Sequence, residues 1–158
     1  MDATQATQQG ATPPPTRPPR LWNPNAAAAW SLFFSPVFGA ILHMKNWEAM
    51  GEHARAAQSR QWAVGMAVAM GLLLLVSLFA VGNRAMDLLC NLASLTLLVA
   101  WYYGSGKAQT TRVLARFGRG YPRKGWVEPV LIAVAVLLAL TALASGVSVL
   151  LALLDTRH

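Results

Sequence analysis

The sequence predicts an all-α membrane protein with three transmembrane helices, a hydrophobic segment broken by proline and a short amphipathic helix at the membrane interface. Of the 158 residues, 55% are hydrophobic and 12% are charged, whereas a soluble domain carries about 25% charged residues. Three apolar stretches of about 20 or more residues are long enough to cross a bilayer. The formal net charge is +7, and the Lys and Arg residues lie between these stretches rather than within them.

The first 20 residues form a polar tail that ends in a proline-rich run. They hold no bulky hydrophobic residue after Met1, so they are predicted to be disordered, with a tendency to polyproline II near the end of the tail. The apolar region of a secretory signal peptide is not visible in residues 1–20, so targeting is expected from an internal hydrophobic segment. Residues 21–158 are predicted to form a single helical membrane domain.

The domain opens with a broken hydrophobic segment, residues 21–45. Asn23, followed by a proline, predicts a helix start, because Asn caps helices and proline fits the first helical turn. Ser35, Pro36 and then Gly39 interrupt the segment, because proline removes a backbone donor and disfavours the helical conformation at the residue before it. Two alternatives follow: a kinked fourth transmembrane span, or two short half-helices that enter and leave the membrane on the same side.

Hydropathy and helical periodicity predict the remaining elements. Trp47 and Met50 fall on one side of a helix and Glu48 and Glu52 on the other, which is typical of a short amphipathic helix at the interface. Long apolar runs predict the three transmembrane helices, of which the last exceeds the thickness of the bilayer core and is expected to tilt. The expected elements are the amphipathic helix at 46–61, the transmembrane helices at 62–81, 85–103 and 127–154, and a basic loop at 104–125.

The distribution of cations predicts the orientation in the membrane. Cytoplasmic loops carry an excess of Lys and Arg, and nine of the 13 cations lie in residues 45–61 and 104–125, which are therefore expected in the cytoplasm. The turn at Arg84 and the C-terminus are expected outside. For the N-terminal tail two rules disagree. The charge rule favours a re-entrant segment and an internal tail, whereas the need to satisfy backbone polar groups at membrane depth favours a full span.

The basic loop is the strongest functional indication in the sequence. Three interpretations remain open: a topology signal, a surface for anionic lipid headgroups, which attract cations by about 1 kcal/mol each, or a surface for an acidic protein partner. Nucleic acid is not expected as a partner, since its recognition needs more than charge. The candidate lipid- or partner-binding residues are Lys107, Arg112, Arg116, Arg119, Arg123 and Lys124.

Residues of the kinds that carry catalysis or bind metals do not form a recognisable motif. His43, Glu48, Glu52 and His53 form the one cluster with metal-ligand types, but their spacing matches no metal-binding motif. The serines in the apolar runs have no neighbouring His or acid that would act as a base. The sequence therefore predicts no catalytic residue, no cofactor, no metal and no enzymatic activity.

These features favour a non-enzymatic accessory or scaffold protein that contacts anionic membrane lipid or a protein partner through the basic loop. The alternative is a small oligomeric transporter or channel in which the broken segment around Pro36 and His43 lines the path. Small residues at helical spacing, such as Ala63, Ala67 and Gly71, permit close helix approach, either within the chain or in a homo-oligomer. None of the predicted spans carries a charge near its centre, which argues against a proton or ion pump.

The stretch NPNAAAAWSLFFSPVFGAILHMKNWEAMGE resembles a segment of small, poorly characterised bacterial inner-membrane proteins. In those proteins an N-P-x-A-A-x-x-W-S-L-x-F-x-P-x-F-G-A-x-L-H-x-x-N-W pattern precedes further spans. The resemblance covers about a fifth of the chain and implies a multi-pass protein of the bacterial inner membrane, but no activity. Because the segment can follow cytosolic domains in relatives, the resemblance also favours an internal N-terminus. The matching residues are Asn23, Pro24, Trp30, Ser31, Leu32, Phe34, Pro36, Phe38, Gly39, Ala40, Leu42, His43, Asn46 and Trp47.

Overall fold

A computed structural model describes residues 17–80 and 82–155, which are mostly helical. Three helical runs are long and apolar enough to cross a membrane: α3, α4 with its continuation through α5, and α6. The described residues contain no β-strand, only an isolated bridge between Leu21 and Arg123. The prediction of an all-α protein with three helices of membrane-spanning length is therefore confirmed, whereas residues 1–16 of the predicted disordered tail lie outside the described part. The elements are α1 (Pro24–Trp30), α2 (Pro36–Ala49), α3 (His53–Phe79), α4 (Arg84–Trp101), the π-helix η1 (Tyr102–Gly106), α5 (Lys107–Phe117) and α6 (Val127–Asp155).

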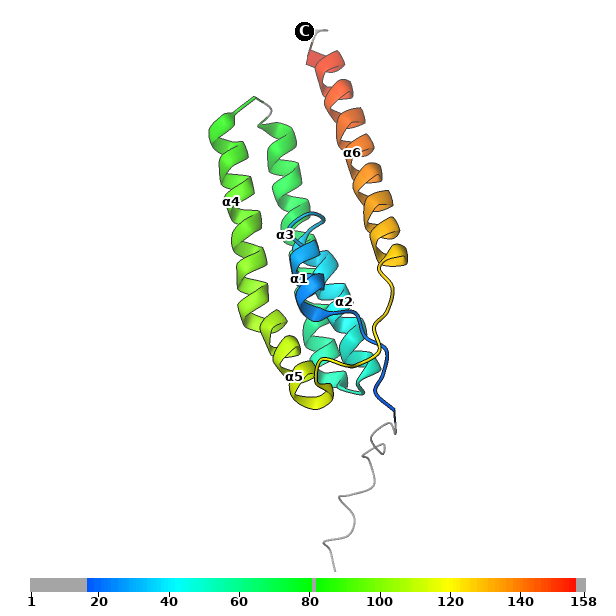
Figure 1. Cartoon of the computed structure of the whole chain (residues 1–158). Helices are drawn as coiled ribbons and strands as arrows, with labels where there is room; N and C mark the ends of the chain where they lie inside the picture. Colours follow the sequence, from blue (N-terminus) through cyan, green and yellow to red (C-terminus); the bar gives the residue numbers. More distant parts are fainter. Residues whose placement is uncertain (1–16, 81, 156–158) are drawn as a thin grey trace, which may run out of the picture.

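The broken hydrophobic segment forms two helices, α1 and α2, that run antiparallel (Figure 1). Asn23 caps α1 as predicted, because its Oδ1 accepts hydrogen bonds from two backbone N–H groups of the first turn. Ser35 has an extended backbone, its hydroxyl accepts a hydrogen bond from the N–H of Phe38, and Pro36 begins α2. At 7 and 14 residues, both helices are shorter than the roughly 20 residues that a span needs.

The amphipathic helix expected at residues 46–61 is not a separate element, and this prediction is corrected. Gly51 has a φ of 76°, a left-handed conformation that residues with a side chain rarely adopt, and the chain turns there. Residues 46–49 form the last turn of α2, and residues 53–61 form the start of α3. α3 then continues as one helix of 27 residues into its apolar half.

The basic loop expected at residues 104–125 is largely helical, and this prediction is also corrected. α4 continues through η1 into α5, which gives an unbroken helical run of 34 residues. Val113 of α5 is buried in the core, so burial of one apolar face stabilises a helix whose other face carries the cations. The helix ends at Gly118, whose φ is 66°. Residues 118–126, called the connecting segment below, lead to α6.

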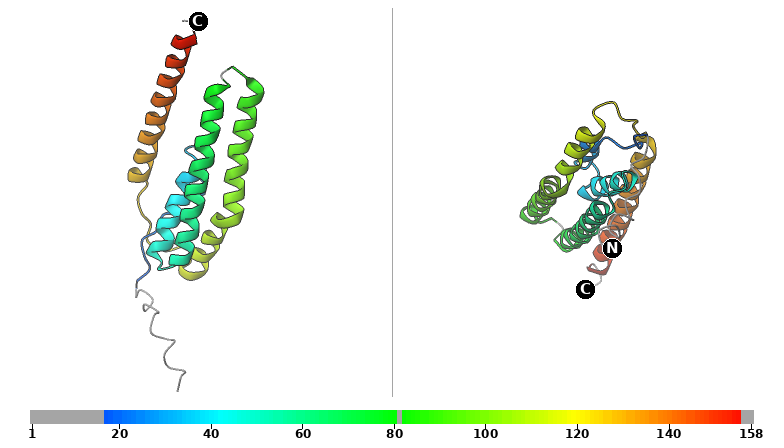
Figure 2. Two further views of the ribbon diagram at one scale, coloured as in Figure 1. Left: turned by 180° about the vertical axis from the view of Figure 1, so that it is seen from behind. Right: turned by 90° about the horizontal axis from the view of Figure 1, so that it is seen from below.

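The short helices gather at one end of the molecule, and only the long helices α3, α4 and α6 extend to the other (Figures 1 and 2). At the packed end, α1, α2 and α5 surround the first half of α3 and the end of α4. We call this part, residues 20–66 and 98–126, the basal unit. Beyond it α3 and α4 continue as an antiparallel hairpin, and α6 leans toward α3 and contacts it sparsely, with no buried residue in its most apolar window. The buried core, and with it the candidate sites, belongs to the basal unit.

Two tryptophans organise the core of the basal unit. Trp47 of α2 packs with buried side chains of α3, α5 and the connecting segment, and Trp101 at the end of α4 packs against α2 and α3. The approach of Trp101 to α2 requires glycine at position 39. A Cβ atom on Gly39 would lie 2.5 Å from Cη2 of Trp101 and would overlap the hydroxyl of Ser31.

Candidate functional site

The six cations predicted to bind a lipid or a partner all lie on the surface of the basal unit. Folding therefore brings them to one end of the molecule, but it places them in different surroundings. Two arginines of α5 face Glu52, whereas Lys124 lies beside Trp22. On α5 are Lys107, Arg112 and Arg116, and in the connecting segment are Arg119, Arg123 and Lys124.

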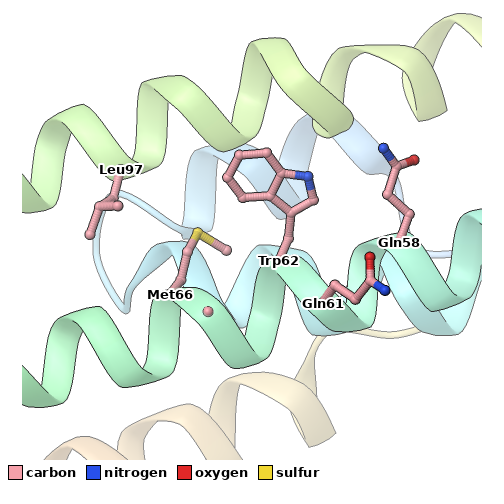
Figure 3. Close-up of a pocket in the computed structure, with 6 residues that line it drawn as sticks. Gln58, Gln61, Trp62, Met66 and Leu97 are labelled. Carbon is pink, nitrogen blue, oxygen red and sulfur yellow. The ribbon is translucent and has the colours of Figure 1, made fainter.

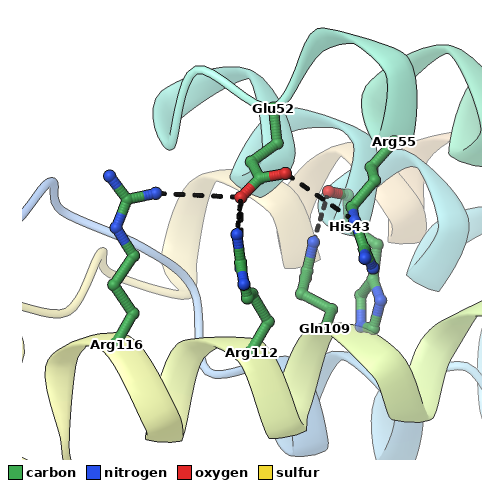
Figure 4. Close-up of polar contacts among 6 residues, drawn as sticks. All are labelled: His43, Glu52, Arg55, Gln109, Arg112 and Arg116. Atoms are coloured by element: carbon green, nitrogen blue, oxygen red, sulfur yellow. Dashed lines mark hydrogen bonds and ion pairs between the residues drawn. The ribbon is translucent and has the colours of Figure 1, made fainter. Parts of the chain in front are cut away.

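Glu52, directly before α3, is surrounded by three arginines (Figure 4). Arg112 donates from Nη2 and Nε to Oε1 of Glu52, at 2.8 and 3.1 Å. Arg116 Nη1 lies 3.8 Å from the same oxygen, and Arg55 Nε lies 3.7 Å from Oε2. Because the Arg112 side chain is 50% exposed, its ion pair contributes on the order of 0.2–1 kcal/mol. The cluster joins α5 to the start of α3 and keeps a net positive charge.

The residues of metal-ligating type singled out in the sequence do not come together. Glu52 pairs with arginines, His43 is buried in the basal unit, and Glu48 and His53 are exposed. Within residues 17–80 and 82–155, no group of three or more His, Cys, Asp or Glu side chains could hold a metal ion. Sequence reasoning missed the pairing of Glu52 with Arg112, because 60 residues separate the two.

A cleft of about 410 Å³ lies where the connecting segment meets the foot of α6. Two backbone hydrogen bonds hold its walls together: Leu21 N–H donates to the Pro122 carbonyl at 3.1 Å, and Lys124 N–H donates to the Leu21 carbonyl at 2.9 Å. The Trp22 indole N–H donates to the Gly125 carbonyl at 2.9 Å. We call it the basic cleft; its lining residues are Arg20, Trp22, Lys124, Gly125, Val127 and Glu128.

Lys124 and two further cations, none with an ion pair among the described residues, lie at or near the basic cleft. Lys124 Nζ lies 4.1 Å from the Trp22 ring centroid, at cation–π distance. Burial lowers the pKa of Lys124, the positive charges of Lys45 and Arg20 lower it further, and Glu128 opposes the change. All ion pairs among the described residues involve Glu52. Sequence reasoning named Lys124 but missed its two cationic neighbours, which precede it by more than 70 residues.

A buried polar network behind the basic cleft holds the segment before α1 in place. Asn46 Oδ1 accepts from the Trp22 N–H at 3.0 Å, and Asn46 Nδ2 donates to the Trp22 carbonyl at 2.9 Å. Nδ2 also donates to Gln109 Oε1 at 3.1 Å, and Gln109 Nε2 donates to the His43 carbonyl at 2.8 Å (Figure 4). Asn46 and Gln109 are fully buried. Sequence reasoning missed this network, although a polar residue one helical turn from both Leu42 and Met50 is a signal for one.

The two residues proposed to line a transport path, Pro36 and His43, lie in the packed interior. His43 is fully buried, its ring meets Trp101 edge-on at 5.0 Å, and its Nε2 donates to the Pro24 carbonyl at 3.2 Å. His43 lies outside the three membrane-length helices, and burial lowers its pKa to about 4, so the ring is neutral near pH 7. Neither Pro36 nor His43 lines the basic cleft or the cavity between α3 and α4.

The cavity between α3 and α4 has a volume of about 340 Å³ (Figure 3). Glutamine side chains lie at one end of it, and Met66 and Leu97 lie at the other. Its lining contains no residue that titrates near neutral pH, so it offers space for an apolar group but no acid–base chemistry. The lining residues are Gln58, Gln61, Trp62, Gly65, Met66 and Leu97.

No protein-family model, curated protein or solved structure matches the chain. Function is therefore inferred from the residues and their arrangement. The chemistry that this arrangement supports is binding of negative charge, by arginines gathered around one carboxylate and by cations gathered at a cleft.

Proposed function

We propose that the protein is a non-enzymatic, multi-pass protein of the bacterial inner membrane that acts as an accessory or scaffold. The cation-bearing end of its basal unit lies on the cytoplasmic side and contacts anionic lipid or a protein partner. One observation carries the proposal: among the described residues, every Lys and Arg except Arg84 lies at the basal end. Such a concentration at one end of a helical membrane protein is typical of its cytoplasmic side.

The α1–α2 hairpin enters the membrane from the cytoplasmic side and returns, which places the N-terminal tail inside. Neither helix has the length of a span. The turn between them exposes Leu32 and Phe33, which are 65% and 75% accessible and suit the acyl region of a bilayer. Backbone N–H groups from Leu32 to Phe34 donate to carbonyls of α1, which meets the requirement that polar backbone at membrane depth be satisfied.

Reporter fusions test this topology. A reporter fused before Leu21 is expected to show a cytoplasmic signal, and a reporter at the turn before Arg84 is expected to show an external one. An external signal from the first fusion would overturn the re-entrant hairpin, because a fourth span reverses the side of the tail.

The cation-bearing surface of the basal unit is called the basic face. Its binding role is tested by substitution of exposed cations that make no ion pair among the described residues. We expect replacement of Lys107, Arg119 and Arg123 by Gln to reduce co-purification of anionic lipid or of a partner protein from native membranes. These substitutions leave the ion pairs of Glu52 with Arg55, Arg112 and Arg116 intact. Arg84→Gln at the opposite end is the control. Unchanged association in the triple variant would refute a binding role for this face.

The alternative, an oligomeric transporter or channel, is supported by one observation. His43 Nδ1, Ser59 Oγ and Trp101 Nε1 are buried without a hydrogen-bond partner, and such atoms are commonly satisfied by internal water. A hydrated path would pass these atoms only after the packing around His43 opens. Flux through the protein in liposomes that His43→Gln abolishes would support this alternative, and a monomer without flux would remove it.

A further inference from the structure

The basic cleft at the foot of α6 combines positive charge with an apolar helix surface. Arg20 and Lys124 line it, and Lys45 directly precedes Asn46, whose side chain bonds the backbone of the lining residue Trp22. Glu128 is the one carboxylate in its lining. The surroundings are therefore net positive, and a bound phosphate monoanion would be favoured over a neutral group.

Hydrogen bonds fix the backbone around these cations. The bridge between Leu21 and Arg123 fixes the segment before α1 against the connecting segment. Asn46 pairs with both backbone polar groups of Trp22, and the indole of Trp22 reaches Gly125. The backbone of Arg20 and Lys124 is therefore held in place beside the cleft, and a ligand that bridges the two side chains would lose little energy to ordering of the backbone.

The apolar side of the cleft points to a lipid. Val127, which lines the cleft and begins α6, is 74% exposed, and Leu131 and Ile132 in the next turn are 62% and 58% exposed. Trp22 and Trp126 lie at the same level, in the contact cluster beside the start of α6, and tryptophan is enriched at membrane–water interfaces. A free phosphate ion would use the cations but not this apolar surface.

We propose that the basic cleft binds the phosphate group of an anionic phospholipid of the cytoplasmic leaflet, with the acyl chains along the exposed face of α6. This inference rests on the proposed function, since it requires the basal unit to lie at the cytoplasmic surface. Arg20, Lys45 and Lys124 attract the phosphate, and Glu128 accepts a hydrogen bond from a headgroup hydroxyl. The connecting segment and the segment before α1 thereby meet around one lipid.

Native mass spectrometry of the full chain in detergent, with phosphatidylglycerol and phosphatidylethanolamine added at equal concentration, tests the proposal. We expect preferential retention of phosphatidylglycerol. Because each cation near a membrane surface strengthens such binding about fivefold, replacement of Arg20, Lys45 and Lys124 by Gln should weaken it about 100-fold. The matched control replaces Arg17, Arg60 and Arg84, three cations outside the cleft lining and outside the candidate lipid- or partner-binding residues, by Gln.

The outcomes separate this inference from the proposed function. Loss of phosphatidylglycerol in the cleft variant alone supports the basic cleft. Equal loss in both triple variants overturns the cleft but leaves a general attraction of cations for anionic lipid. No preference for phosphatidylglycerol in the wild type overturns the cleft and leaves only the protein partner of the proposed function. Displacement of the lipid by inorganic phosphate at equal concentration would assign the site to a free ion instead. Circular dichroism of the cleft variant shows whether it has folded. If it has not, the single variant Lys124→Arg is compared with the wild type; because this substitution keeps the charge, it should retain most of the binding.

Discussion

Replacement of Asn46 by Ala should strongly destabilise the basal unit. The Asn46 amide is the hydrogen-bond partner of the Trp22 N–H, the Trp22 carbonyl and Gln109 Oε1, at 2.9 to 3.1 Å, and the residue is fully buried. The substitution leaves three buried polar atoms without that partner, at about 1–3 kcal/mol each. Since water entering the new cavity satisfies part of them, the expected loss in unfolding free energy is about 3–5 kcal/mol.

Equilibrium unfolding of the full chain in mild detergent, by titration with sodium dodecyl sulfate and far-ultraviolet circular dichroism, measures this loss. Asn25→Ala is the matched control, because Asn25 Oδ1 also accepts a hydrogen bond across the α1–α5 contact, from Thr110 Oγ1 at 3.0 Å, but at an exposed position. Its expected loss is less than about 1 kcal/mol. Equal losses in the two variants would refute the conclusion that the buried network holds the segment before α1 against α2 and α5.

Three further predictions concern the interior and the arginine cluster. Gly39→Ala should cost about 1–3 kcal/mol, because its Cβ would lie 2.5 Å from Cη2 of Trp101; thermal unfolding checks this against Gly65→Ala, where nothing lies within 4 Å. The unfolding free energy should fall by up to about 3 kcal/mol as the pH drops from about 6.5 to about 4, because burial lowers the pKa of His43 to about 4 and the unfolded chain therefore binds that proton first. His43→Gln keeps a donor near the Nε2 position and should remove this part of the pH dependence; an unchanged denaturation profile across that range would contradict the assignment. Glu52→Gln should lower the unfolding free energy by less than about 1 kcal/mol, and the difference should shrink at high salt; a salt-independent difference would argue against ion pairing.

The helix boundaries that the sequence predicts correctly are those set by neighbouring residues. Asn23 caps α1, and Ser35 with Pro36 separates α1 from α2, because capping and the steric effect of proline act within a few residues. The helix expected at 46–61 is interrupted because Gly51 adopts a left-handed conformation where α2 turns into α3. Periodicity alone cannot reveal such a turn, since the apolar pattern continues on both sides of it.

The basic region shows the opposite error. Its cations dominate the composition of residues 104–125, which predicts a solvated loop, but the helix α5 forms because Val113 is buried against α2 and α3. The apolar face of α5 is short, and it stabilises the helix only when it is buried against a surface that residues far away in the chain provide. The same dependence hides the role of Glu52, which only the packing of α5 against the start of α3 reveals.

The sequence by itself determined the three membrane-length helices, the helix break at Pro36 and the clustering of cations in two stretches. Hydropathy, proline geometry and charge are properties of contiguous residues, so they can be read along the chain. Only the tertiary structure decided that Arg20 and Lys124 face one cleft, and that Asn46 joins the segment before α1 to α5. These groups are far apart in the sequence, and their meeting depends on how the helices of the basal unit pack and on which buried polar groups that packing must satisfy.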